Sequence, residues 1–134
     1  MILPQVTPLY AGLLALLYVV LTINVIRGRW RMRIGLGDGG EKQMQKLVRA
    51  HGNFAEYAPL VVVLLLLLEL AQLSPQLLHA LGGAFVVGRI LHAIGIGRSA
   101  GTSAGRMIGT ILTLTVLTTQ ALLLLWLVLS GELG

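Results

Sequence analysis

The sequence predicts an all-α integral membrane protein, a bundle of four transmembrane helices. Of its 134 residues, 56% are hydrophobic and only 11% are charged, a composition too apolar for a soluble domain. Four apolar stretches are long enough to cross a bilayer. They predict helices over about 8–27, 41–73, 75–96 and 106–130, within one domain covering residues 1–134.

The first helix is predicted by a stretch without charged side chains that ends at Ile26. Thr7 as N-cap and Pro8 at the first helical position are typical of a helix start. No basic stretch precedes the apolar run, so we expect a retained transmembrane helix and not a cleaved signal peptide. The arginines that follow, with Trp30 among them, are typical of a membrane interface.

The remaining helices are separated by short polar or glycine-rich connections. The second begins near Glu41, and Pro75 in the turn at 74–76 predicts the start of the third. Gly82 and Gly88 predict close approach of the third helix to a neighbour. The glycine-rich connection over 95–106 lacks the spacing of a phosphate-binding loop. The fourth helix is uncharged from Met107 onward.

Charge placement predicts the topology. All ten Lys and Arg residues lie in or next to the first and third connections. The positive-inside rule then places both connections in the cytoplasm and both termini outside. The formal charge of +5 is explained as membrane-flanking charge, so we expect no nucleic-acid partner.

A polar cluster at the head of the second helix is the main candidate site. At 100° per residue, Arg49, Asn53 and Glu56 fall within an arc of about 60° and span about 10 Å along the axis. Ionisable groups at membrane depth face a bundle interior or a wet cavity and are functional candidates. The alternative is that Arg49 and Glu56 only brace the bundle. His51 points to the opposite side, and His51 with Glu56 is not a metal-ligand spacing. The chain has no cysteine, which excludes cysteine metal sites, and we predict no metal site.

The stretch from Arg49 to Leu60, RAHGNFAEYAPL, resembles the MAPEG family, the membrane-associated proteins in eicosanoid and glutathione metabolism. The shared pattern is R-A-x-x-N-x-x-E-Y-x-P-L on the second of four helices. The stretches Gly37–Gly40 and Gly88–His92 look like bacterial members, which implies a multi-pass protein of the bacterial inner membrane. The resemblance further implies a homotrimer with glutathione bound at subunit interfaces near the cytoplasmic side.

The resemblance also implies roles for individual residues. The residues that would bind glutathione are Arg27, Arg49, Asn53, Glu56, Tyr57, Arg89 and His92. Arg27 would reach the site of a neighbouring subunit. Arg106 would stabilise the glutathione thiolate, with Arg98 as the alternative. A position that is often tyrosine in the family's enzymes is Ile96 here.

Two functions therefore remain open at the level of sequence. One is a membrane-bound glutathione transferase or peroxidase that acts on lipophilic electrophiles, with glutathione as co-substrate. The other is a non-catalytic lipid- or glutathione-binding protein of the same fold. A small transporter is disfavoured because arginines surround Glu56 and the first helix carries no acid.

Overall fold

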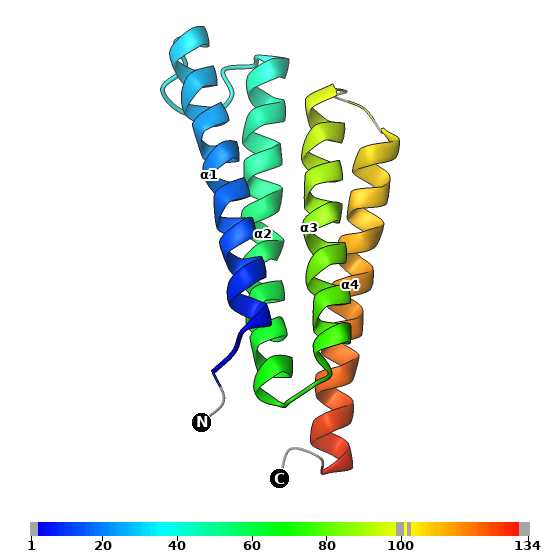
Figure 1. Cartoon of the computed structure of the whole chain (residues 1–134). Helices are drawn as coiled ribbons and strands as arrows, with labels where there is room; N and C mark the ends of the chain where they lie inside the picture. Colours follow the sequence, from blue (N-terminus) through cyan, green and yellow to red (C-terminus); the bar gives the residue numbers. More distant parts are fainter. Residues whose placement is uncertain (1–2, 99–100, 102, 132–134) are drawn as a thin grey trace.

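The computed structural model describes residues 3–98, 101 and 103–131 as four antiparallel α-helices (Figure 1). They are α1 (Val6–Met32), α2 (Lys42–Leu70), α3 (Pro75–Arg98) and α4 (Ala104–Ser130). Each helix is long and apolar enough to cross a membrane. The predicted all-helical, four-span architecture is therefore confirmed.

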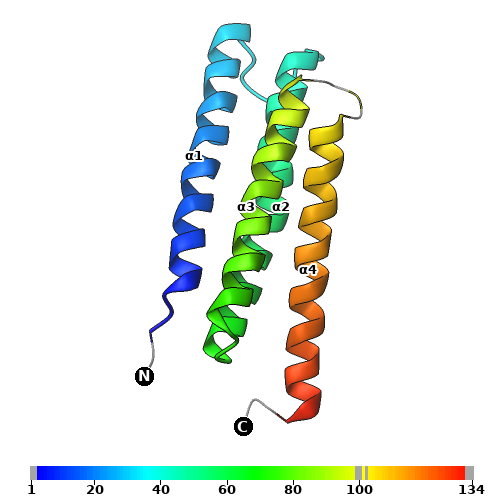
Figure 2. The ribbon, with the colours of Figure 1, turned by 45° about the vertical axis from the view of Figure 1, so that its right-hand side comes forward.

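The helices form an open bundle, with α2 and α3 in the middle and α1 and α4 on opposite sides (Figure 2). The closest packing is between α3 and α4, followed by α1 on α2, whereas α1 and α4 share no contact within the described ranges. Few side chains of α1 are buried, among them Leu14 and Leu21. Most of its apolar surface therefore faces outward, as a lipid-facing helix requires.

Glycines bring α3 and α4 together. A Cβ atom on Gly109 would collide with the carbonyl of Gly88 and with the backbone of His92. Gly82 is likewise covered by the ring of Tyr10 from α1. The close approach predicted from the glycines of the third helix is thus present, and it fixes α4 against the part of α3 that carries His92.

The start of α1 differs from the prediction. The helix begins at Val6 and its N-cap, Gln5, makes no side-chain cap. The carboxylate of Glu69, on α2, accepts hydrogen bonds from the backbone N–H groups of Gln5, Val6 and Thr7 at 2.6, 2.7 and 2.7 Å. The prediction of Thr7 as the cap was wrong, because a residue distant in sequence satisfies the free N–H groups.

The far end of α1 continues to Met32, past the predicted end near residue 27. Gly28 is buried there against Met44 of α2, so the arginine-rich stretch packs on the second helix. Arg29 Nη1 donates a hydrogen bond to the carbonyl of Gly37 at 3.0 Å, which holds the connecting loop to the helix end. One of the four interfacial arginines therefore has a structural role.

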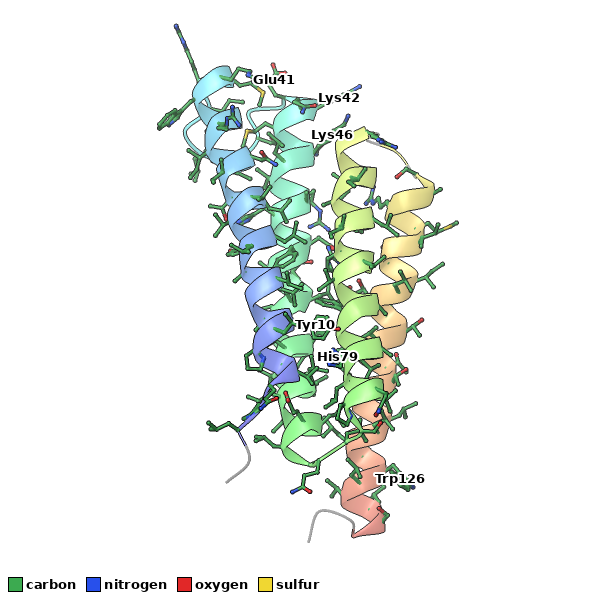
Figure 3. The ribbon with its side chains drawn as sticks, viewed as in Figure 1. Tyr10, Glu41, Lys42, Lys46, His79 and Trp126 are labelled. Carbon is green, nitrogen blue, oxygen red and sulfur yellow. The ribbon has the colours of Figure 1, made fainter. Side chains whose placement is uncertain are left out.

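Both basic connections lie at one end of the bundle, and both described chain ends lie at the other (Figure 1). Lys42 and Lys46 are at the first of these ends and Trp126 is at the second (Figure 3). This arrangement is the one that the topology prediction requires. Which end faces the cytoplasm stays a prediction based on charge.

Candidate functional site

A polar face on α2 carries the three residues of the predicted cluster. Arg49 Nη1 and Glu56 Oε1 are 3.7 Å apart and form the ion pair found within the described part of the chain. Their side chains remain 57% and 56% exposed. Because the pair is long and half solvent-exposed in a single chain, both charges are free to take other partners. We call Arg49, Asn53 and Glu56 the α2 polar face.

Arg89 lies behind this face and is almost wholly buried, with 2% of its surface exposed. Its Nη2 donates to Oδ1 of Asn53 at 2.6 Å and lies 3.2 Å from Nδ1 of His92. Its Nη1 donates to the hydroxyl of Thr113 at 3.3 Å. One guanidinium thus ties together α2, α3 and α4.

Two aromatic rings of α2 complete the surroundings of Arg89. The guanidinium carbon lies 5.9 Å from the ring centre of Phe54 and 6.0 Å from that of Tyr57. Both distances are within the range in which a cation is attracted to a ring face. No carboxylate of the described residues pairs with Arg89, and its Nε atom is buried without a partner. The interior of the site is therefore electropositive.

Contacts with α1 show at which level along that helix the α2 polar face lies. Nε2 of His51 lies 3.2 Å from the hydroxyl of Thr22, and the ring of Tyr18 stacks on both His51 and Phe54. Thr22 and Tyr18 belong to the part of α1 that carries no charge. The α2 polar face consequently lies at the level of an uncharged transmembrane stretch. His51 faces α1 and not the cluster, as its helical position predicts.

The other arginines of the predicted site, Arg27, Arg98 and Arg106, lie apart from the α2 polar face. Arg106 is in the first turn of α4, where its backbone N–H donates to Oγ of Ser103 at 3.3 Å. Its Nη1 donates to the carbonyl of Gly101 at 3.5 Å, within the connection that precedes α4. Arg27 and Arg98 are exposed and make no contact with the α2 polar face among the described residues.

An apolar cavity of about 330 Å³ lies between α1 and α2. Tyr18 of α1 lines it, together with Phe54, Ala55, Ala58 and Pro59 of α2. Phe54 is therefore shared, because it faces this cavity and also stacks beneath Arg89. The arrangement places a hydrophobic space directly beside the charged cluster.

Comparison with known proteins decides the family. The family model of MAPEG matches residues 7–126, which include α2 and α3 and most of α1 and α4. The chain belongs to the MAPEG family. This MAPEG chain is also similar to the inner membrane protein YecN of Escherichia coli strain K12, with 37% identity over 91 residues, covering 68% of this chain and 70% of that protein. The protein of the same name from Escherichia coli O6:H1 matches to the same extent.

Membership in MAPEG and the likeness to an inner membrane protein support a multi-pass protein of the inner membrane. Within this MAPEG bundle, sequence reasoning missed Thr113 and Phe54 as partners of Arg89. A threonine hydroxyl within a helix can bond back to a carbonyl of its own helix, so the sequence carries no signal of a partner on another helix. Thr113 does so, donating to the carbonyl of Gly109 at 2.8 Å, and it accepts from Arg89 as well.

Proposed function

We propose that this MAPEG protein binds glutathione on the α2 polar face and uses it as co-substrate in transfer to, or reduction of, lipophilic electrophiles. The observation that carries the proposal is the half-exposed pair of Arg49 and Glu56, with Asn53 between them, in front of the buried charge of Arg89. A separated pair of opposite charges is complementary to a zwitterion.

The chemistry of glutathione supports this assignment. The tripeptide has two carboxylates and one ammonium group. Arg49 is suited to a carboxylate through paired hydrogen bonds, and Glu56 to the ammonium. Tyr57, Arg89 and His92 line the inner side of the same region. Any direct contact by Arg89 or His92 requires the ligand to reach side chains that are 2% and 3% exposed in the single chain.

Arg106 is the residue that we assign to thiol activation. A nearby cation lowers the pKa of a thiol and supplies thiolate at neutral pH. The thiolate sulfur then forms a carbon–sulfur bond with an electrophile, whose leaving group departs with the electron pair. With a lipid peroxide, two glutathione molecules are oxidised to the disulfide while the peroxide is reduced to an alcohol and water. The cavity beside Phe54 supports an apolar second substrate.

A homotrimer is part of the proposal. Half-exposed charges level with an uncharged transmembrane stretch are costly against lipid, because ionisable groups at that depth face protein or a wet cavity. A neighbouring subunit would cover the α2 polar face and keep it hydrated enough to bind a ligand. Arg27, which lies away from its own chain's cluster, would then contribute to a neighbour's site.

One observation favours a second function, a non-catalytic membrane protein that binds lipid or glutathione. Ile96, at a position that is often tyrosine in the family's enzymes, is only 4% exposed and packs in the apolar core. No hydroxyl is supplied there. Glutathione binding without turnover would select this alternative.

The test is calorimetric titration of the detergent-solubilised protein with glutathione, followed by a conjugation assay. We expect binding, and a 10- to 100-fold loss of affinity in Glu56→Gln, because a charge-assisted hydrogen bond contributes about 1.5–3 kcal/mol. Glu41→Gln, an exposed carboxylate at the start of α2, is the matched control and should keep wild-type affinity. If Glu56→Gln leaves affinity unchanged and only lowers thermal stability, the pair is structural and the site assignment is wrong.

A further inference from the structure

We infer that Arg89 is a positioning residue that fixes the hydrogen-bonding polarity of the site, so that Asn53 and His92 present N–H donors to the ligand. The place beside them then favours a group with hydrogen-bond acceptors, and a carboxylate above a neutral one. This inference rests on the proposed function, because it specifies which part of a zwitterionic ligand lies where. It also gives Arg89 a role that does not require direct contact with the ligand.

The orientation of the Asn53 amide follows from the chemistry of its partner. A guanidinium has five N–H donors and no acceptor. The Asn53 atom that lies 2.6 Å from Arg89 Nη2 must therefore be the carbonyl oxygen. The amide nitrogen of Asn53 points away from Arg89 and has no hydrogen-bond partner among the described residues. Asn53 thus keeps two unpaired N–H bonds, while its carbonyl oxygen is held by Arg89.

The same reasoning fixes the tautomer of His92. Its Nδ1 lies 3.2 Å from Arg89 Nη2, and only a lone pair on Nδ1 can accept from a guanidinium. The proton of the neutral ring is then on Nε2, which is a donor. Thr113 completes the set, since its hydroxyl proton goes to the Gly109 carbonyl and its oxygen accepts from Arg89.

Donors and acceptors therefore occupy separate positions on the α2 polar face. Arg49 and Asn53 present donors, and Glu56 presents the acceptor on this face. The buried charge of Arg89, which forms no ion pair among the described residues, strengthens the preference for an anion next to Asn53. A ligand fits when its carboxylate lies against Asn53 and its ammonium lies against Glu56. Esterification of the carboxylates removes the charge that this arrangement recognises.

The experiment compares the dissociation constants of glutathione and of its diethyl ester for the solubilised protein. We expect the wild type to prefer glutathione about 10-fold or more. In Asn53→Asp the carboxylate still accepts from Arg89, so the fold is kept, but the outward donors are lost and a negative charge is added. The preference for glutathione should fall about 10-fold, while the thermal midpoint stays at or above the wild-type value.

Arg89→Met tests the positioning role itself, because it frees the Asn53 amide without leaving a buried charge. In a double-mutant cycle, the effects of Asn53→Asp and Arg89→Met on the affinity ratio should be strongly non-additive. Thr113→Val removes the contact to Arg89 Nη1 and the hydroxyl's bond to the Gly109 carbonyl but leaves the contacts of Arg89 with Asn53 and His92, so it should leave the ratio unchanged.

An unchanged ratio in Asn53→Asp, or additive effects in the cycle, would overturn the inference. If the wild type binds neither compound, the proposed function fails, and the thermal midpoint alone decides the orientation of Asn53. A midpoint of Asn53→Asp below that of the wild type then contradicts the Asn53–Arg89 contact, and a retained or higher midpoint supports it.

Discussion

At the scale of single residues, the burial of Arg89 has to be offset locally. The effective penalty for burying one ion is several kcal/mol. Hydrogen bonds to a charged group contribute about 1.5–3 kcal/mol each, and ring contacts about 0.5–2 kcal/mol each. Asn53, His92 and Thr113 supply the hydrogen bonds, and Phe54 and Tyr57 supply the rings. These gains are of the same size as the penalty, so the charge is held without a carboxylate.

Arg106 and Arg98 are distinguished by their surroundings. Arg106 is half-buried in the first turn of α4, where Ser103 accepts from its backbone N–H, whereas Arg98 is exposed at the end of α3. We expect Arg106→Ala to keep glutathione binding within a few-fold but to abolish the ultraviolet thiolate absorbance of the bound ligand. Arg98→Ala is the matched control and should keep that absorbance. The reverse result would assign thiol activation to Arg98.

The residues of the α2 polar face could be read from the sequence because helical periodicity alone places Arg49, Asn53 and Glu56 on one side. Their inner partners could not. Arg89 and Thr113 are on different helices, and the contact between them depends on how closely α3 and α4 approach. That distance is fixed by Gly88 and Gly109, whose effect appears only when both helices are packed together.

At the scale of helices, the start of α1 depends on α2. The carboxylate of Glu69 accepts three backbone hydrogen bonds there and also interacts favourably with the helix dipole. We expect Glu69→Gln to lower the free energy of unfolding by about 1–3 kcal/mol, measured by thermal unfolding in detergent. Gln76→Ala, an exposed polar side chain at the same end, should change stability little. An unaltered midpoint in Glu69→Gln would mean that water replaces the carboxylate without cost.

The number and order of the helices could be predicted because each span needs a long apolar run, which is a local property of the sequence. The ends of α1 could not be predicted as well. Its N-terminus is capped by Glu69, far along the chain, and its C-terminal extension is held by packing of Gly28 on α2. Both determinants are tertiary contacts, so neither has a signal in the neighbouring residues.

At the scale of the whole molecule, most of the basic residues lie at one end of the bundle. We expect reporter fusions at Gly39 and Gly101 to give a cytoplasmic signal and a fusion at Ser74 to give an external one, because most Lys and Arg residues lie near the first two sites and none lies near Ser74. A fusion near the N-terminus is a further control and should match Ser74. The opposite pattern would reject the orientation.

The assembly is tested separately. We expect native mass spectrometry and cross-linking in mild detergent to give a trimer, since the α2 polar face is level with uncharged helix and needs protein cover. Protein with Glu69→Gln, which is far from this face, should assemble normally once folded. Monomers or dimers alone, across detergents, would contradict the trimer.

The placement of Arg89 in the middle of α3 has a consequence for how the chain enters the bilayer. An arginine at the centre of a lone helix opposes insertion by about 2.5–3.5 kcal/mol. Asn53 and the rings of Phe54 and Tyr57 all belong to α2, which is synthesised first, whereas Thr113 follows later. Most of the partners for this charge therefore precede it in synthesis, and α3 can insert against a helix that already offers it an acceptor.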